Sequence, residues 1–545
     1  MIRFLRAKKR VTLPFTWWSK VNALVRKNSY DQAYLSCDKR LQEKPRDWRK
    51  IQRIGLDLAE KSLWIEAERF LKLAGQGVQD SGLLECRGDV LEKIYYSYIQ
   101  EPWAIGKLEE AFECWRRSLE LNPRNLSLQL RLGATLMVIG RIQEAQAIFT
   151  ELEKIRSKLR AELPKDLVNV KTISCIPNGI GHITLLDYYI KMRELGIISK
   201  DKVLLLVPKK SNKTNFSFLS YWEKWGLETI EEPHKIKRFQ PTLRITDENL
   251  NVYSMINGQV NLVYHAIAEV EKRWQQKGGG PLLRLNEEHQ QKGWEILCNA
   301  GMKRSDWFVT LHVRESGYTG EGDQPPNQHR NSRIETYLEG VKRITEAGGW
   351  VVRIGDPTMT PLPTMDRVID STQMDSKPDW MDLFLCAENR FYLGTSSGPC
   401  MIPPCFGKKC ALANYELLSG RPFYFGNIYI PKLLYDKKKE RNLVFREALA
   451  AETANCYHSN FYLARGLEFI HNSPDEIDEL VQEMLESSKG NLCYTQEEEI
   501  LQNKFNSLGS SLGATYGTNS RLGRGFLARH KDLLGEDHDV EATKA

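Results

Sequence analysis

The chain has 545 residues, which at roughly 100 to 200 residues per domain suggests about three domains. Hydrophobic residues make up 41% and charged residues 27% of the sequence, and this balance excludes a largely disordered chain and a membrane-embedded one. The formal charge of +7 is the small difference between 77 basic and 70 acidic residues, so it gives no argument for a nucleic-acid partner.

Residues 1–13 are predicted to form a basic arm ahead of the first helix. The arm carries five basic side chains, namely Arg3, Arg6, Lys8, Lys9 and Arg10. A secretory signal would need an apolar core of about 7 to 15 residues after such a stretch, and polar residues and a proline interrupt it here. We therefore expect a cytoplasmic protein that touches a membrane at most peripherally, through basic and aromatic side chains on an anionic surface.

The cysteines are scattered singly along the chain. There are 11 of them, and they form no CxxC pair and no Cys/His cluster with the spacing of a zinc site. Reduced thiols in the cytosol are the simplest interpretation, and we expect no bound metal.

Residues 14–160 contain an internal repeat. Four alanines mark it, and the first two and the last two are each 34 residues apart: Ala33, Ala67, Ala111 and Ala145. Gly55 and Gly133 each stand twelve residues before an alanine of this set. This period, with small residues at these places, is typical of the tetratricopeptide repeat, a helix-turn-helix unit that stacks into a superhelix. Four repeats are predicted, with an insertion near residues 95–103; a generic helical bundle is the alternative.

Residues 168–300 are predicted to form the first of two Rossmann-like α/β halves. The apolar runs at residues 168–176 and 203–207 are expected as strands. Gly179 and Gly181 lie in the loop after the first run, ahead of an expected helix. Glycines at such a turn let a ligand approach the backbone, and the helix N-terminus offers N–H groups to an anion. The alternative is a turn that needs glycine only for its geometry.

Residues 301–490 are predicted to form the second α/β half, and residues 491–545 a C-terminal extension with a polar tail. Strands are expected at residues 308–314, 350–354 and 391–394. The loop at residues 315–330 is long enough to close over a ligand. Asn331 and Ser332 are expected to cap a helix that runs to Ala347, and residues 473–487 have the spacing of another helix.

Polar groups follow the three expected strands of this half. They are His312 and Arg314, then Asp356, and then Thr395, Ser396 and Ser397. Because ligands collect at the carboxyl ends of the strands of an open parallel sheet, these groups are expected to meet in one crevice. Arg314 would clamp a diphosphate, and the turn at residues 395–397 would cradle the same phosphates. Taken singly, each group has a structural alternative, as a core residue, an ion-pair partner or a helix cap.

These residues resemble the nucleotide-sugar site of fucosyltransferase-like glycosyltransferases of the GT-B fold. The resemblance rests on His312-Val313-Arg314 at a strand end and on residues 391–398 some eighty positions later. Residues 170–420 also look like a bacterial family of glycosyltransferases known chiefly from sequence. In the fucosyltransferase-like enzymes the arginine of the His-x-Arg motif binds the donor's β-phosphate and the later serine/threonine turn assists it. The family motif usually continues with a second arginine, where this chain has Glu315.

The resemblance implies donor-binding roles for Arg314 and for the turn at residues 395–397, and less directly for Asp356. It implies a metal-independent glycosyltransferase, without a resident cofactor, that moves a sugar from a nucleotide diphosphate sugar to a glycan or protein acceptor. His312, Glu315 and His182 are the candidate general bases. The repeats are expected to bind the acceptor or a protein partner.

A non-catalytic scaffold is the alternative function. In it, the repeats assemble a complex and the α/β part is a degenerate nucleotide-sugar binder. A kinase-like P-loop enzyme is disfavoured because the sequence has no glycine-rich phosphate loop with its lysine.

Overall fold

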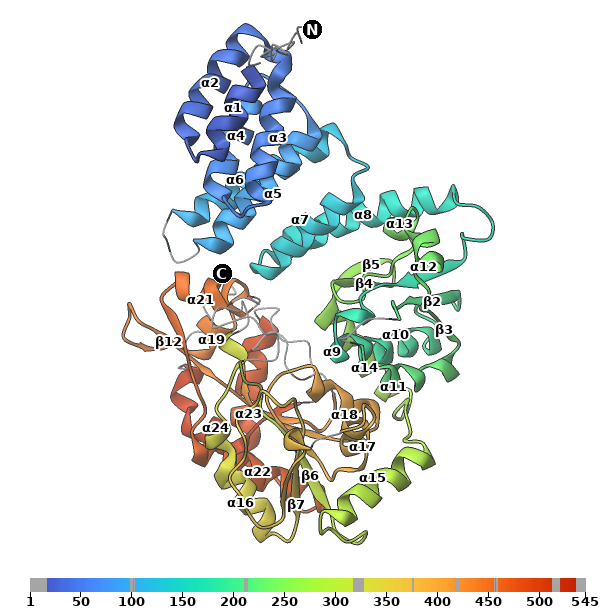
Figure 1. The fold of residues 1–545 in the computed structure, drawn as a ribbon. Coiled ribbons are helices and arrows are strands. Elements are labelled where there is room, and N and C mark those ends of the chain that lie inside the picture. The colour runs from blue at the N-terminus through green and yellow to red at the C-terminus, as the bar shows by residue number, and fades with distance from the viewer. Residues whose placement is uncertain are drawn as a thin grey trace, which may run out of the picture. The chain divides into compact units, whose positions relative to one another are not determined.

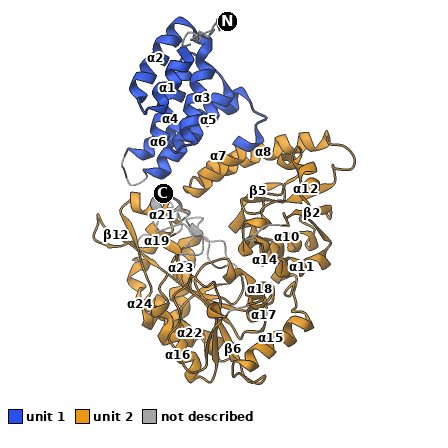
Figure 2. Ribbon diagram, in the orientation of Figure 1, with its two compact units in different colours: residues 1–128 blue, residues 129–545 orange. Residues whose placement is uncertain are grey.

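The computed structural model describes residues 17–98, 101, 103–209, 214–316, 328–374, 377–416, 422, 424–454, 456, 459–511 and 520–535. The predicted basic arm and the end of the polar tail lie outside these residues, and the predicted closing loop at residues 315–330 is described only at its two ends. The chain divides into two compact units, residues 1–128 and residues 129–545 (Figure 2).

Unit 1 consists of antiparallel helices joined by short turns (Figure 1). They are α1 (Trp17–Arg26), α2 (Tyr30–Glu43), α3 (Trp48–Ala59), α4 (Trp64–Ala74), α5 (Ser81–Ser97) and α6 (Ala104–Leu121). Ala33, Ala67 and Ala111 are fully buried between them. A Cβ atom on Gly55 would lie only 2.7 Å from Leu71 Cγ, so this position must stay small. The region resembles tetratricopeptide repeats, which confirms the prediction from the 34-residue period. The predicted insertion lengthens α5 and α6 to 17 and 18 residues.

The fourth helical pair, α7 (Leu126–Val138) and α8 (Ile142–Ala161), continues the period, but the boundary between the units falls inside α7. Arg156 explains why α8 belongs to unit 2. Its buried guanidinium donates hydrogen bonds to the Tyr253 hydroxyl at 2.9 Å and to the Ile245 carbonyl at 3.0 Å. Phe149 of α8 also stacks on Tyr253, with ring centroids 4.5 Å apart. Helix α8 is thus fixed to the α/β part of the chain.

The first α/β half contains a parallel sheet of three strands in the order β1-β2-β3. These are β1 (Val170–Ile173), β2 (Lys202–Leu206) and β3 (Leu227–Ile230). After β1 the chain passes through η2 (Ile176–Asn178) into the short helix α9 (Ile180–Ile183) and then α10 (Leu185–Glu194). A hairpin of β4 (Tyr253–Ile256) and β5 (Gln259–Leu262) leads into α14 (Val263–Gln276). The strands expected near residues 168 and 203 are therefore present.

The second half contains a parallel sheet of seven strands in the order β15-β11-β10-β9-β6-β7-β8. The strands are β6 (Phe308–His312), β7 (Trp350–Arg353), β8 (Val368–Asp370), β9 (Tyr392–Gly394), β10 (Cys410–Tyr415), β11 (Ile428–Pro431) and β15 (Arg521–Leu522). From β6 the chain builds outward through β7 and β8, then returns to place β9 on the other side of β6. The strand order therefore reverses between β6 and β9. The two parallel sheets confirm the predicted α/β class.

Helices flank this sheet. Helix α16 (Leu338–Glu346) packs against α22 (Pro474–Ser488), and α15 (Glu287–Asn299) packs against α17 (Met381–Glu388). Ser473 caps α22, because its hydroxyl accepts from the Glu476 N–H at 3.2 Å while the Glu476 carboxylate accepts from the Ser473 N–H at 2.8 Å. The helix expected at residues 473–487 is thus confirmed. Strand β15 comes from the predicted C-terminal extension and pairs with β11.

The prediction that Asn331 and Ser332 cap the helix to Ala347 was wrong. The short helix η5 (Ile334–Tyr337) comes first, and α16 begins only at Leu338, without a side-chain cap. The Asn331 side chain is used elsewhere, since its Oδ1 accepts a hydrogen bond from Arg314 Nη1. Among the described residues, no helix has both the length and the apolar character that a membrane span requires.

Candidate functional site

Of the polar groups predicted at the strand ends, those that follow β6 and β9 meet where the strand order of the large sheet reverses. His312, the last residue of β6, pairs with Gly394 of β9. The Thr395 N–H donates to the His312 carbonyl at 3.2 Å, and the Arg314 N–H donates to the Thr395 hydroxyl at 3.0 Å. Main-chain and side-chain hydrogen bonds thus join the two strand ends. Such a reversal point is where open parallel sheets form a crevice for ligands.

His312 lies beneath this edge and is only 5% exposed. Its Nδ1 lies 3.2 Å from the Ser397 hydroxyl. Burial, with repulsion from the Arg353 guanidinium, lowers the pKa of His312 to about 3. The imidazole is therefore neutral and a weak base, and its contact with Ser397 gives it a positioning role in the turn.

Three cations converge above the strand ends. Arg314 follows β6, Arg330 ends the short helix η4 (Gln328–Arg330), and Lys432 follows β11. The Arg330 Nη2 donates to the Ser396 carbonyl at 3.1 Å, and the Lys432 Nζ donates to the carbonyls of His329 and Asn331, both at 2.7 Å.

Burial and repulsion between neighbouring cations lower the pKa of two of these groups, Arg314 and Lys432. Burial and the neighbouring Arg330 lower the pKa of Arg314 to about 10. Burial lowers the pKa of Lys432 to about 8, with a smaller contribution from Arg314 and against the attraction of Glu416. Cations crowded together in this way are a site that favours an anion.

Glu416, a carboxylate in this cluster, was not predicted from the sequence. Glu416 follows β10, is 8% exposed, and accepts from the Ser396 hydroxyl, which lies 2.6 Å from Oε1 and 2.5 Å from Oε2. Its Oε1 also lies 3.1 Å from Arg330 Nε. The Ser396 hydroxyl is thus already engaged. Within the described residues, the backbone N–H groups of Ser396 and Ser397 donate to no protein acceptor.

Arg330 and Lys432 were missed as well. Lys432 directly follows an apolar run at residues 428–431. The other candidate residues were predicted because each follows such a run, and the same pattern would have identified Lys432. Arg330 lies in a loop, where no periodicity marks it.

Glu315, a predicted general base, takes part in a structural ion pair. Its Oε1 lies 3.0 Å from the Nη2 of the fully buried Arg353, and its Oε2 accepts from the Thr360 N–H at 2.7 Å. Both oxygens therefore fix the start of the loop after β6. Asp356, at the end of β7, accepts from the Thr358 N–H at 2.9 Å. A polar cavity of about 430 Å³ adjoins this part of the sheet edge, lined in part by Glu315, Asn331 and Thr358.

The glycine loop of the first half approaches the second half. A Cβ atom on Gly181 would lie 2.9 Å from Gly398 Cα, so the two backbones touch. The close approach that Gly181 permits is therefore to protein backbone and not to a ligand. Gly179 has φ +144°, which favours glycine, with open space beside it. His182, the next residue after Gly181, is half-buried, and burial lowers its pKa. Of the three candidate bases, it is the one in the first half.

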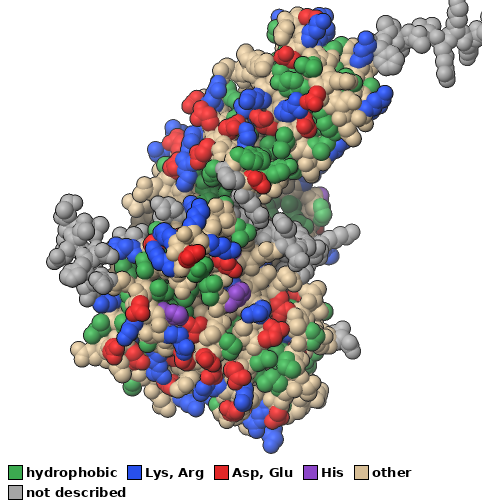
Figure 3. Space-filling model, turned by 90° about the vertical axis from the view of Figure 1, so that its left-hand side faces the viewer, with side chains coloured by type: hydrophobic (Ala, Val, Ile, Leu, Met, Phe, Trp, Pro, Cys, Tyr) green, Lys and Arg blue, Asp and Glu red, His purple; other side chains and the backbone are tan. Residues whose placement is uncertain are grey.

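No group of three or more His, Cys, Asp or Glu side chains placed to hold a metal ion occurs within the described residues. On the face in Figure 3, basic and acidic side chains are interspersed, and the described surface shows no large patch of one sign there.

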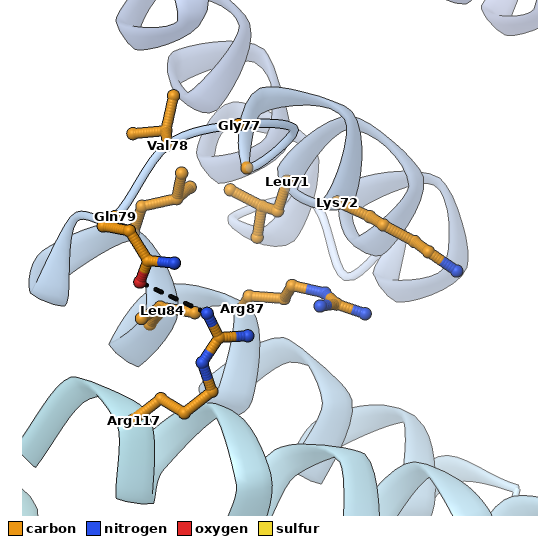
Figure 4. Close-up of a pocket in the computed structure, with 10 residues that line it drawn as sticks. Leu71, Lys72, Gly77, Val78, Gln79, Leu84, Arg87 and Arg117 are labelled. Atoms are coloured by element: carbon orange, nitrogen blue, oxygen red, sulfur yellow. Dashed lines mark hydrogen bonds between the residues drawn. The ribbon is translucent and has the colours of Figure 1, made fainter. Parts of the chain in front are cut away.

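Unit 1 has a hollow of its own, of about 310 Å³, between α4, α5 and α6 (Figure 4). Leu71 and Leu84 contribute apolar surface to it. Arg87 pairs with Glu68 at 3.1 Å and with Glu110 at 3.3 Å, and Arg117 donates to the Gln79 side chain at 3.2 Å. The hollow is amphipathic and has no arrangement suited to catalysis.

No protein-family model matches the chain. A TPR repeat-containing protein of Methanocaldococcus jannaschii is 23% identical over 258 residues, which cover 46% of this chain and 41% of that protein. The chain thus spans about two fifths of the length of this curated relative.

Two solved glycosyltransferase structures are also similar. The family 9 glycosyl transferase of Veillonella parvula is 12% identical, covers 57% of this chain and 80% of its own, and has a TM-score of 0.27. The iron-containing dodecameric glycosyltransferase TibC of enterotoxigenic Escherichia coli is 10% identical, covers 58% and 76%, and has a TM-score of 0.32. These TM-scores are too low to establish a shared fold, so the site rests on its own geometry.

Proposed function

We propose that the protein is a glycosyltransferase that takes its sugar from a nucleotide diphosphate sugar and passes it to a glycan or protein acceptor. The observation that carries this proposal is the convergence of Arg314, Arg330 and Lys432 on the point between β6 and β9 where the strand order reverses. Crevices at such points bind nucleotides, and guanidinium groups match the geometry of phosphate oxygens.

The cations would serve the reaction by stabilising the diphosphate as it leaves the sugar. Negative charge grows on the bridging oxygen when the glycosidic bond breaks, and fixed positive groups in a water-poor site stabilise that charge strongly. Arg314, which follows β6 and donates a hydrogen bond to Asn331, would take this role. The backbone N–H groups of Ser396 and Ser397 would bind the same phosphates.

His182 would act as the general base if the reaction inverts the sugar. Its pKa is lowered by burial, so its imidazole is neutral near pH 7 and can accept a proton from an acceptor hydroxyl. It follows Gly181, whose backbone touches Gly398, the residue after the turn at residues 395–397. The amphipathic hollow of unit 1 is where the repeats would contact an acceptor or a protein partner.

A thermal-shift screen of the full chain against GDP-, UDP- and dTDP-sugars tests the proposal. We expect one nucleotide class to raise the melting temperature, because a ligand at 100 times its Kd stabilises a folded protein by about 2.7 kcal/mol. Arg314→Ala should weaken that binding by roughly 10- to 100-fold, since it removes a charge-assisted contact.

The matched control is Arg238→Ala, which removes an exposed arginine that pairs with Asp166 at 3.4 Å. The control should behave as the intact protein does. If no nucleotide sugar shifts the intact protein, the transferase proposal fails and the non-catalytic scaffold takes its place.

A further inference from the structure

Among the described residues, the Glu416 carboxylate contacts the cation cluster through Arg330, and the transferase proposal gives it no role. Glu416 is 8% exposed. Its carboxylate accepts a hydrogen bond from the Ser396 hydroxyl and forms an ion pair with Arg330 through Nε. These are groups that a phosphate oxygen would use in the same place. The carboxylate therefore competes with the ligand that the cluster is built to bind.

Electrostatics explains why an empty site would need such a group. Arg330, Lys432 and Arg314 are at least half-buried, and crowded cations without a counter-charge are costly to hold in a folded protein. The Glu416 carboxylate offsets part of that cost when no anion is bound. A diphosphate brings its own negative charge, and two anions on the same cations repel each other strongly.

We propose that Glu416 is a built-in counter-ion that occupies the place of a phosphate in the empty site and is displaced when a diphosphate binds. The inference rests on the proposed function, because it assumes that the cluster takes a diphosphate. Exchange of one anion for another lowers the affinity of the site and hastens the release of the nucleoside diphosphate product.

The direction in which nucleotide affinity changes on neutralising Glu416 distinguishes the counter-ion role from other roles of this residue. A carboxylate that accepted hydrogen bonds from a sugar or ribose diol would add to affinity, so its neutralisation would weaken nucleotide binding. A carboxylate that competes with phosphate has the opposite effect. Glutamine has nearly the same shape and its amide oxygen still accepts from Ser396, so Glu416→Gln changes mainly the charge.

The experiment is isothermal titration of the full-length protein with inorganic pyrophosphate and, separately, with UDP, GDP and ADP. We expect Glu416→Gln to bind pyrophosphate and the preferred nucleotide about tenfold more tightly than the intact protein, because a repelling charge is removed. The control is Glu468→Gln. It removes an exposed carboxylate on β14 (Leu467–Ile470) that forms an ion pair with Lys437 at 3.0 Å. Its affinities should stay within about twofold of the intact protein.

A second variant protects the test against a folding defect. Glu416→Asp keeps the negative charge but places it one methylene farther from the cations. Its gain in affinity should therefore be smaller than the gain in Glu416→Gln. Far-ultraviolet circular dichroism establishes that each variant is folded before titration. Unchanged or weaker binding in both folded variants overturns the inference.

The outcomes separate the two proposals. Tighter pyrophosphate binding in Glu416→Gln, without stabilisation by any nucleotide sugar, supports the counter-ion and rejects the transferase. Arg314-dependent nucleotide binding that weakens in Glu416→Gln supports the transferase and rejects the counter-ion. If pyrophosphate binds neither the intact protein nor the variants, both proposals fall.

Discussion

At the scale of single residues, burial decides what each side chain in the site can do. His312 and Arg314 stand two positions apart, and the sequence pattern assigned both to ligand chemistry. In the structure His312 is 5% exposed and bonded to Ser397, whereas Arg314 is half-buried beside Arg330. Exposure depends on the strand's neighbours, which the spacing of two residues cannot reveal. Glu315 is likewise a plausible base in the sequence and an ion-pair partner of Arg353 in the structure.

The anion affinity of the cluster should depend on pH through Lys432. Its pKa of about 8 means that the ammonium loses its proton as the pH rises through that value, and the site then loses one positive charge. The second ionisation of a phosphate has a pKa of about 6, so a nucleoside diphosphate already carries most of its charge at pH 7 and gains little more above it. We expect the affinity for the preferred nucleoside diphosphate to fall several-fold between pH 7 and pH 9, as measured by isothermal titration.

Lys432→Met provides the comparison for this pH dependence. The variant lacks the titrating group, so its affinity should be lower at pH 7 and should show no step near pH 8. Among the described residues, Lys432 interacts electrostatically with Glu416, Arg314 and His471, and burial lowers the pKa of His471 to about 4, far from the step. A step that persists in Lys432→Met would assign the titration to another group.

At the scale of elements, the strands were predictable and the turns between them were not. Buried parallel strands are continuous apolar runs, so the runs near residues 308, 350 and 391 stand out in the sequence. The start of α16 was misplaced because Asn331 resembles a helix cap, yet its side chain binds Arg314 and η5 intervenes. The local sequence around Asn331 cannot show that its side chain accepts a hydrogen bond from Arg314 and is therefore not available as a helix cap.

The contact of α9 with Gly398 gives a prediction at this scale. Gly181→Ala would place a Cβ atom 2.9 Å from Gly398 Cα, and backbone cannot move aside as a flexible side chain does. We expect the variant to lose roughly 1 to 3 kcal/mol of stability through overpacking and to melt at a lower temperature in scanning calorimetry.

Gly280→Ala is the control for that variant. Gly280 has open space where its Cβ would lie and no left-handed backbone conformation, so the same chemical change should leave the melting temperature nearly unaltered. Equal melting temperatures for the two variants would show that the Gly181 contact is not tight in solution.

At the scale of the whole molecule, the boundary between the compact units does not follow the end of the repeats. The period runs through Ala145 in α8, but Arg156 and Phe149 fix that helix to the α/β part. Arg156 supplies hydrogen bonds to the Tyr253 hydroxyl and to the carbonyls of Ile245 and Asp247. Without α8, these buried polar groups would lose their partner at a cost of several kcal/mol in total.

Two truncated chains test this boundary. A chain that begins at Asn125, just before α7, should fold cooperatively and keep the nucleotide response of the full protein, since it contains α8. A chain that begins at Leu163, just after α8, should aggregate or melt at a markedly lower temperature. Thermal unfolding followed by circular dichroism compares them, and equal stability would mean that α8 belongs with the repeats.

The sequence by itself determined the class of the fold and the strand ends at which the candidate site was predicted. Repeat period and apolar runs are local patterns, and the hydrophobic effect converts them into helical pairs and buried parallel strands in nearly any context. The turn at residues 395–397 and the His312 to Arg314 stretch could be identified for the same reason, because each follows a recognisable strand.

Only the tertiary structure decided which groups meet at the strand ends and in what state of charge. Arg330 lies in a loop, and Glu416 and Lys432 each follow a strand, β10 and β11 respectively. At the extremes these residues are more than eighty positions apart in the chain, and the sheet topology brings them together. Burial of Lys432 and of Arg314 lowers the pKa of each, and the fold brings the Glu416 carboxylate next to Arg330. Charge interactions act through space and depend on desolvation, so no local pattern in the chain encodes them.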